Sequence, residues 1–372
     1  MADTNPLVTA NKLGQSIWID YIQRSMLESG ELTQLITNDA ITGLTSNPSI
    51  FEAAIAKTNE YDASLAEFVK TNPQSSNLEI FNYLAVADIQ AAADEFAQVH
   101  ADSDGQDGMV SLEVAPELAH NASETIERGL QLNAAVDRPN VMIKVPGTKA
   151  GVEAFEALTE AGVNVNVTLL FSVTRYREIA QAYIRALAKR AVQGKDVSGI
   201  ASVASFFVSR VDTAVDTALA EKDPDIAKLL GGKIGIANAK VAYGYFANLF
   251  GSDQWAMLAK GGAKPQRLLW ASTGTKNPEY RDTYYLEELL GPQTVNTVPP
   301  KTLDAFRDHG VAENRLASAL NVAHEQLSSL KQHGISLDQI TNKLEEDGLK
   351  SFADSFDRLM LSIEEKRKQI AA

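Results

Sequence analysis

Eight short segments rich in apolar and β-branched residues recur along the 372-residue chain, and each is followed by an amphipathic stretch. Strands that alternate with helices are typical of βαβ units and a parallel sheet. The segments are residues 16–20, 41–47, 108–114, 140–147, 163–171, 200–208, 267–273 and 294–299. Eight such units predict an α/β protein closed into a (β/α)8 TIM barrel, and the main alternative is an open, doubly wound sheet.

The connections between the expected strands are helical in pattern. Residues 148–161 and 172–195 repeat apolar side chains at helical spacing. Two long connections, 48–106 and 213–266, are predicted to be helical insertions, because no Pro/Gly/Ser-rich linker isolates them as separate domains. The sequence therefore predicts a single barrel domain over residues 1–372.

The C-terminal part of the chain, from about residue 312 to residue 372, is expected to be a helical extension of the barrel. Phe352, Phe356, Leu359 and Ile363 fall on one face of a helix there. An apolar face of this kind is normally buried. We expect this helix to pack on the barrel exterior.

The composition narrows the classes of function. The chain has no cysteine, which excludes disulfides and thiolate sites and fits a reducing cytoplasm. Its formal net charge of −14 argues against a nucleic-acid-binding surface. No stretch reaches the roughly 18 consecutive apolar residues that a membrane span needs, and the N-terminal segment lacks the apolar core of a secretory signal. We expect a cytoplasmic monomer or small homo-oligomer with no nucleic-acid or membrane partner.

Several common catalytic motifs are missing from the sequence. The five histidines form no metal-ligand pattern, and there is no P-loop, GxGxxG or GxSxG motif. The Gly-Gly pairs at 231–232 and 261–262 are typical of turns. The prediction is an enzyme without a metal or a cofactor.

Polar side chains follow the predicted strands at their carboxyl ends, where TIM barrels build their active sites. Asp20 ends the first strand, Asn47 ends the second, and Glu113 lies near the end of the third. In the fifth strand Asn166 and Thr168 alternate with valines. Because successive side chains of a barrel strand point inward and outward in turn, this alternation places both polar residues in the interior.

Lys144 lies within the apolar fourth strand, between Ile143 and Val145. A buried ammonium group without a partner is costly, so one interpretation is a core lysine held in a salt bridge. The other is an amine nucleophile, because burial of a lysine favours its neutral form. An imine formed with a carbonyl substrate would act as an electron sink for breaking a C–C bond. Asp20 and Glu113 are then candidate proton carriers.

Basic and hydroxyl residues follow the later strands, where barrels often bind phosphate. Arg210 comes after the sixth strand, near Ser205, and Ser272 and Lys276 come after the seventh. These four residues are candidates for binding a phosphorylated substrate. The structural alternative for Arg210 is an ion pair with Asp212 or another carboxylate.

A series of short motifs gives the sequence a resemblance to the transaldolase family, in its longer bacterial form. The motifs cover nearly the whole chain and are specific in combination. They are IWIDY at 17–21, GLTSNPSIF at 43–51, SLEV at 111–114, MIKVPGT at 142–148, NVNVTLLFS at 164–172 and SFFVSRVD at 205–212.

The resemblance implies a (β/α)8 barrel and a role for each matching residue. Lys144 corresponds to the Schiff-base lysine, and Asp20 to the carboxylate that accepts a proton during C–C cleavage. Glu113 corresponds to the acid/base that acts through a water, and Thr168 to the residue that positions this water. The remaining matches are to substrate and phosphate contacts: Asn47, Asn166, Ser205 and Arg210.

The resemblance also implies a reaction. A dihydroxyacetone unit would pass reversibly from sedoheptulose 7-phosphate to glyceraldehyde 3-phosphate, giving erythrose 4-phosphate and fructose 6-phosphate in the pentose phosphate pathway. The sequence departs from the shorter family members after the seventh strand, where they carry a serine and an arginine. Ser272 and Lys276 stand there instead, and a lysine offers a point charge rather than a guanidinium fork.

Two alternatives to a transferase remain at this stage. The first is an aldolase that releases free dihydroxyacetone, although the chain length and Glu113 favour transfer. The second is a barrel without activity that binds sugar phosphates or a partner protein. Every matching catalytic position is filled, which favours an enzyme.

Overall fold

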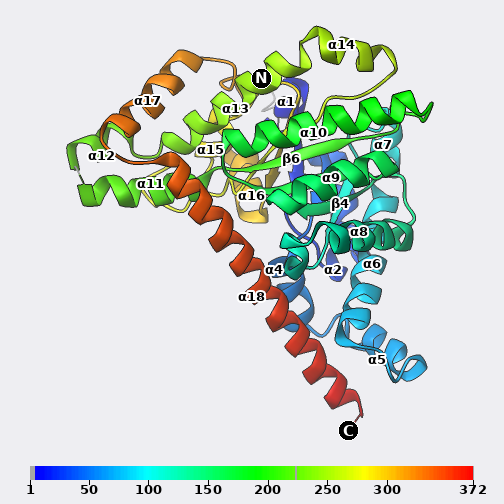
Figure 1. Ribbon diagram of the computed structural model, residues 1–372. Helices are drawn as coiled ribbons and strands as arrows, with labels where there is room; N and C mark the ends of the chain where they lie inside the picture. The colour runs from blue at the N-terminus through cyan, green and yellow to red at the C-terminus, as the bar shows by residue number, and fades with distance from the viewer. Residues whose placement is uncertain (1–4, 223, 372) are drawn as a thin grey trace.

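In the computed structural model, which describes residues 5–222 and 224–371, eight parallel strands close into a barrel in chain order (Figure 1). The strands are β1 (Gln15–Ile19), β2 (Ile41–Thr45), β3 (Met109–Glu113), β4 (Val141–Pro146), β5 (Val165–Leu170), β6 (Ser202–Phe207), β7 (Arg267–Ala271) and β8 (Thr294–Val298). Strand β8 pairs in parallel with β1, with Thr297 opposite Trp18. This pairing completes the ring, so the predicted (β/α)8 barrel is confirmed and the open sheet is excluded.

The connections are helical, as expected. The ordinary connections contain α2 (Arg24–Glu28), α3 (Glu31–Asp39), η2 (Pro116–His120), α8 (Ala122–Val136), α9 (Lys149–Ala161), α10 (Val173–Val192) and α15 (Tyr284–Glu288). The two long connections contain α4 (Pro48–Phe51), η1 (Glu52–Ala56), α5 (Asp62–Thr71), α6 (Asn77–Glu95) and α7 (Ala97–Asp102), and then α11 (Ser209–Lys222), α12 (Pro224–Leu230), α13 (Ile234–Phe250) and α14 (Asp253–Lys260). The ends of the chain contribute α1 (Pro6–Lys12), α16 (Pro300–His309), α17 (Leu320–Gln332) and α18 (Leu337–Ala371).

Helix α9 shows how local sequence positions a strand of the site. The Thr148 hydroxyl accepts a hydrogen bond from the Gly151 amide at 2.9 Å and thereby starts the helix. A Cβ atom at Gly151 would lie 1.8 Å from the carbonyl oxygen of Pro146. Only glycine allows this close approach, which fixes the first turn of α9 against the end of β4.

The side chains of the strands divide into an outer and an inner layer. Val165 and Val167 pack outward in the same apolar cluster as Phe155 of α9. A second cluster contains strand residues of the barrel interior, such as Trp18 and Met142, and extends to α11 and α18. The alternation predicted for the fifth strand is therefore confirmed, and its polar side chains belong to the interior.

The amino end of the barrel is closed by a buried polar network. Arg267 of β7 forms an ion pair with Asp107 at 3.0 Å. The same aspartate accepts hydrogen bonds from the Ser16 hydroxyl at 2.6 Å and from the Trp18 indole at 3.1 Å. Because these groups satisfy one another, they close this end of the barrel without burying an unpaired charge.

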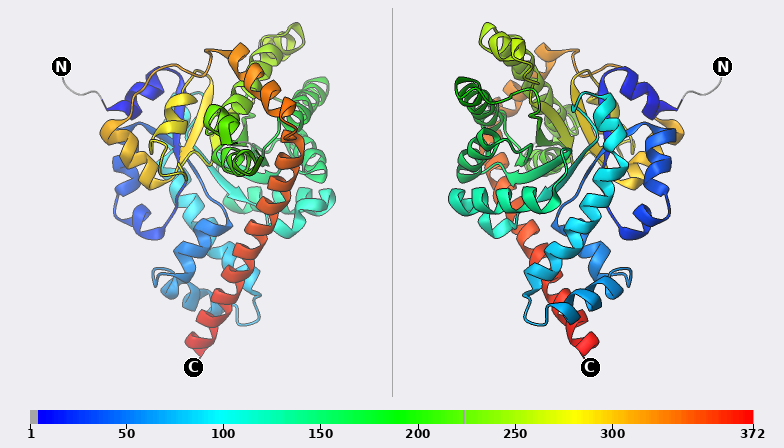
Figure 2. Two further views of the ribbon diagram at one scale, coloured as in Figure 1. Left: turned by 90° about the vertical axis from the view of Figure 1, so that its left-hand side faces the viewer. Right: turned by 90° about the vertical axis from the view of Figure 1, so that its right-hand side faces the viewer.

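Helix α18 contacts the barrel and the helices that follow β2 and β3. Its apolar side chains Phe352, Phe356, Leu359 and Ile363 are buried as predicted. The helix does not simply pack on the outer wall, however, because it contacts α4, η1, η2 and β5, and Phe352 lines the cavity that also contains Lys144. Both views of Figure 2 show α18 descending past the barrel to end beside the helices of the first long connection.

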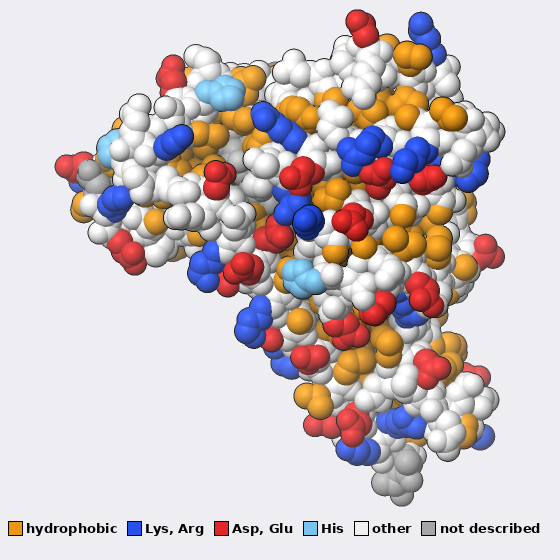
Figure 3. Space-filling view, in the orientation of Figure 1, with side chains coloured by type: hydrophobic (Ala, Val, Ile, Leu, Met, Phe, Trp, Pro, Cys, Tyr) orange, Lys and Arg blue, Asp and Glu red, His pale blue; other side chains and the backbone are white. Residues whose placement is uncertain are grey.

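Charged side chains of both signs are intermingled on the face that carries α9, α10 and α18, as Figure 3 shows. Glu156 of α9, for example, pairs with Arg185 at 2.6 Å and with Lys189 at 2.9 Å, both on α10. Among the described residues, the helices are all too short or too polar to cross a membrane.

Candidate active site

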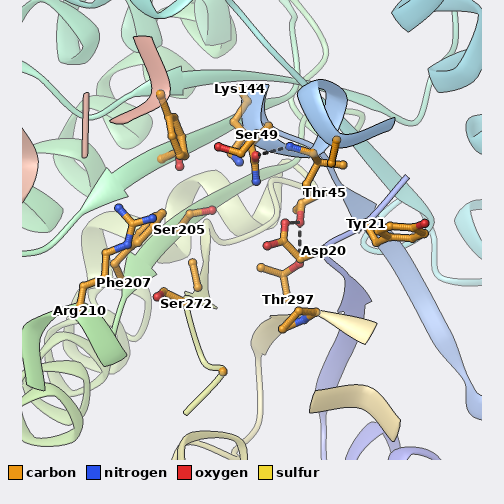
Figure 4. Close-up of a pocket in the computed structure, with 18 of the residues that line it drawn as sticks. Asp20, Tyr21, Thr45, Ser49, Lys144, Ser205, Phe207, Arg210, Ser272 and Thr297 are labelled. Atoms are coloured by element: carbon orange, nitrogen blue, oxygen red, sulfur yellow. Dashed lines mark hydrogen bonds between the residues drawn. The ribbon is translucent and has the colours of Figure 1, made fainter. Parts of the chain in front are cut away.

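A cavity of about 340 Å³ opens at the carboxyl ends of the strands (Figure 4). It is lined by side chains from the strands, from the loops that follow them and from α18. Those that carry polar groups are Asp20, Tyr21, Thr45, Asn47, Ser49, Lys144, Thr168, Ser205, Arg210, Ser272, Lys276 and Thr297. The structure thus gathers eight of the ten predicted site residues around one cavity, and Glu113 and Asn166 lie outside its lining.

Lys144 projects from β4 into this cavity and is only 5% exposed. Its Nζ donates a hydrogen bond to the carbonyl oxygen of Ser46 at 3.1 Å and lies 3.5 Å from Oε2 of Glu113. The salt bridge expected of a core lysine is therefore present, with Glu113, but the Lys144 amine also faces the cavity. The arrangement gives a ligand access to Lys144, which a purely structural core lysine would not need.

Glu113 lies behind Lys144, at the end of the adjacent strand β3. Burial raises the pKa of the Glu113 carboxyl to about 7, although Lys144 opposes this increase. Within the described part of the chain, Oε2 of Glu113 and Oγ1 of Thr168 are both buried without a hydrogen-bond partner. Buried polar atoms are normally satisfied, so both atoms can still bind a small polar group.

Asp20 is held by two threonines that sequence reasoning missed. The Thr45 hydroxyl donates a hydrogen bond to Oδ1 of Asp20 at 2.7 Å. It also lies 2.6 Å from the Thr297 hydroxyl, and because the Thr45 proton is already used, Thr297 donates to Thr45. Burial raises the pKa of Asp20, while Lys144, Thr45 and Arg210 oppose the increase. The carboxylate is oriented by its neighbours and is a stronger base than an exposed aspartate.

The side-chain amide of Asn166 forms its hydrogen bonds with other side chains of the protein and does not line the cavity. Its Oδ1 accepts a hydrogen bond from the Ser205 hydroxyl at 2.7 Å, and its Nδ2 donates to the Ser111 hydroxyl at 3.1 Å. Ser205 itself lines the cavity. Asn47 also lines it, while its Oδ1 accepts from the Ile50 amide and caps α4.

Arg210 and Lys276 add two cations to the cavity lining besides Lys144. The Arg210 guanidinium lies 5.3 Å from the centre of the Phe207 ring. The alternative ion pair with Asp212 is wrong, because Asp212 instead accepts a hydrogen bond from the Gly235 amide at 2.6 Å. Figure 4 shows Arg210 and Tyr21 at opposite ends of the cavity.

Ser272 joins the loop after β7 to the start of α11. Its hydroxyl lies 2.9 Å from that of Ser209, and its φ of 54° is in the left-handed region. Lys276, further along the same loop, is exposed and lines the cavity. The segments after β6 and β7 therefore present cations and hydroxyl groups to one region, as phosphate binding requires.

Comparison with known proteins agrees with this arrangement. A statistical model of the Transaldolase/Fructose-6-phosphate aldolase family matches residues 17–363. The chain is 44% identical to a transaldolase from Trichodesmium erythraeum, over 99% of both chains. It is also 44% identical to a transaldolase from Mycolicibacterium smegmatis over 97% of both chains, and 43% identical to transaldolase 2 of Nostoc punctiforme over 99% of both. The chain therefore belongs to the transaldolase/fructose-6-phosphate aldolase family of enzymes.

Proposed function

We propose that the protein transfers a dihydroxyacetone unit from a ketose phosphate to an aldose phosphate through a Schiff base on Lys144. The donor is sedoheptulose 7-phosphate and the acceptor is glyceraldehyde 3-phosphate, and the products are erythrose 4-phosphate and fructose 6-phosphate. The observation that carries the proposal is the cavity that brings the Lys144 amine and the Asp20 carboxylate together with Arg210. This activity would place the protein in the cytoplasmic pentose phosphate pathway.

The first half of the reaction breaks the donor. The Lys144 amine adds to the C2 carbonyl, and loss of water from the adduct gives a protonated imine. Asp20 then accepts the proton of the C4 hydroxyl, the C3–C4 bond breaks, and its electron pair moves into the imine. An aldose phosphate leaves, and an enamine of three carbons stays on Lys144.

The second half of the reaction reverses these steps on the acceptor. The enamine carbon attacks the acceptor aldehyde, and Asp20 returns its proton to the new hydroxyl group. Water then adds to the imine and releases the ketose phosphate.

Glu113 is suited to the proton transfers that make and break the imine. A general acid or base works best when its pKa is close to the working pH, and burial brings the pKa of Glu113 to about 7. Glu113 lies outside the cavity lining, so it would act through a bridging water. The unpartnered oxygens of Glu113 and Thr168 support such a water.

The decisive experiment is borohydride reduction of the protein in the presence of fructose 6-phosphate, followed by peptide mass spectrometry. We expect a reduced three-carbon adduct on Lys144. The matched control is Lys149→Ala, which removes an exposed lysine near the same strand end. Absence of an adduct from folded wild-type protein would exclude the Schiff base.

The family description also names an aldolase activity, which is the second candidate. An aldolase would release free dihydroxyacetone at the same rate with or without an acceptor aldose. A transferase would release little of it until the acceptor is added. Product analysis under both conditions separates the two reactions, and a wild type with neither reaction would favour a barrel that only binds sugar phosphates.

A further inference from the structure

Two of the cations that line the cavity, Arg210 and Lys276, come from segments that are joined directly outside the cavity. Arg210 lies in the first turn of α11, and Asp216 lies further along the same helix. Lys276 and Tyr280 both belong to the loop that follows β7. The Tyr280 hydroxyl donates a hydrogen bond to Oδ2 of Asp216 at 2.9 Å and so links the loop to the helix.

A glycine turn strengthens this link. Asp216 accepts a second hydrogen bond from the Gly232 amide at 2.9 Å, through its other oxygen. The Tyr280 ring packs directly on this turn, since a Cβ atom at Gly232 would lie 2.7 Å from the ring, and the φ of Gly232 is +68°. The Tyr284 hydroxyl, just after the loop, donates to the Gly232 carbonyl at 3.1 Å. The turn predicted at 231–232 is thus the point to which both segments attach.

The loop itself is compact and would transmit this attachment to Lys276. The Thr275 hydroxyl donates a hydrogen bond to the Arg281 carbonyl at 2.8 Å. Lys276 and Tyr280 both lie in the segment that this hydrogen bond closes. Burial and the adjacent Asp216 raise the pKa of Tyr280 to about 12, so the phenol stays a hydrogen-bond donor at neutral pH. Lys276 has no ion-pair partner within the described ranges 5–222 and 224–371, so nothing else there holds its ammonium group through charge.

We propose that Tyr280 and Asp216 are positioning residues for the substrate phosphate, because their hydrogen bond fixes the spacing between Arg210 and Lys276. The inference rests on the proposed function in requiring a phosphorylated substrate. Neither residue lines the cavity, so both act through the cations. A phosphate held by two cations gains most when their positions are set before it binds.

The test compares Tyr280→Phe, which removes one hydroxyl and keeps the ring on Gly232, with Tyr243→Phe. Tyr243 is a matched control, because its hydroxyl also makes one hydrogen bond, at 3.2 Å to the Pro292 carbonyl, and it does not line the cavity. For Tyr280→Phe we expect KM for glyceraldehyde 3-phosphate to rise about tenfold, the size of a hydrogen bond to a charged group. The KM for unphosphorylated glyceraldehyde should stay within about twofold of the wild-type value. The inhibition constant of inorganic phosphate should rise in parallel with the KM for glyceraldehyde 3-phosphate.

A second variant separates positioning from a general loss of structure. Asp216→Asn keeps an oxygen for the Gly232 amide but weakens the contact with Tyr280. If the hydrogen bond between Tyr280 and Asp216 is responsible, the variant that combines Tyr280→Phe with Asp216→Asn should resemble either single variant. It should not show the product of their two effects on KM. Equal changes in KM for phosphorylated and unphosphorylated acceptors would overturn the proposal, as would no change at all in folded protein. Failure of wild-type transfer would instead refute the proposed function.

Discussion

The Lys144 amine lies 3.5 Å from the Glu113 carboxylate, and both side chains are only 6% exposed. At this separation the two groups interact strongly without forming a short, closed ion pair. A buried pair of this kind leaves the Lys144 amine able to turn toward a ligand, while the pKa of the Glu113 carboxyl stays close to neutral pH. The predictions that follow test what this pair and its neighbours do.

Glu113→Gln tests the acid–base role. The amide cannot exchange protons, so we expect kcat to fall by about 10²–10⁴. The wild-type profile of kcat/KM against pH should show a limb near pH 7, from the pKa of about 7, that disappears in the variant. Glu117→Gln alters an exposed glutamate nearby and should retain wild-type kinetics. A variant that keeps full activity would remove Glu113 from the mechanism.

Asp20→Asn tests the cleavage step. The variant keeps Lys144 and should still form the imine, but it cannot accept the C4 hydroxyl proton. With fructose 6-phosphate as the substrate, borohydride should therefore trap the intact six-carbon ketose on Lys144 instead of a three-carbon fragment. Peptide mass spectrometry distinguishes the two adducts. Thr45→Val removes the hydrogen bond to Asp20, together with the contact to the Thr297 hydroxyl, and should lower kcat by about tenfold. A three-carbon adduct in Asp20→Asn would assign the cleavage base elsewhere.

How far the sequence predicts this site depends on the kind of contact involved. Lys144 could be predicted because a lysine in an apolar strand is unusual, and Thr168 because the strand period places it in the interior. Thr45 and Thr297 could not, since threonine is common in strands and their hydrogen bonds join three separate strands. Likewise, no sequence pattern shows that Ser111 and Ser205 occupy the amide of Asn166.

The fold was predictable to the same extent. Local periodicity determines the strands and most helices, and eight units in a row imply closure. The path of α18 was not predictable from its apolar face, because a helix amphipathicity pattern shows that one side is buried but not against which surface. The partner of Asp212 is the Gly235 amide in the first turn of α13, which belongs to a different helix from Asp212.

Asp212→Asn tests a buried carboxyl that takes no part in the proposed chemistry. Burial raises the pKa of Asp212 to about 7 in the folded protein, above the ordinary aspartate value of about 3.9. The folded state then binds a proton more tightly than the unfolded state between these pH values, so the free energy of unfolding falls as pH rises toward 7. From about pH 5 to about pH 8 we expect this carboxyl to contribute a loss of roughly 2–4 kcal/mol, which the asparagine variant lacks.

Denaturant unfolding at several pH values measures this effect. Asp253→Asn changes an exposed aspartate at the start of α14 and should keep the wild-type dependence. Parallel curves for the wild type and Asp212→Asn would show that Asp212 does not titrate in this range.

Phe352→Ala tests the contribution of α18 to the cavity. We expect the free energy of unfolding to fall by about 3 kcal/mol, because the side chain is 5% exposed. The variant should also release more free dihydroxyacetone relative to transferred product, since water enters through the shortened wall. Phe68→Ala, on α5, removes a ring stacked on Tyr83 away from the cavity. This control should lose stability without a change in the product ratio.

The position of Phe352 also has a consequence for the order in which the protein matures on the ribosome. The barrel is closed by β8, which ends at Val298, whereas the side chain that completes the wall of the cavity is synthesised later. A nascent chain that has completed every strand therefore still lacks one part of the wall around Lys144. That part is supplied when α18 emerges and places Phe352 against the cavity, so the surroundings of the amine are completed after the barrel itself.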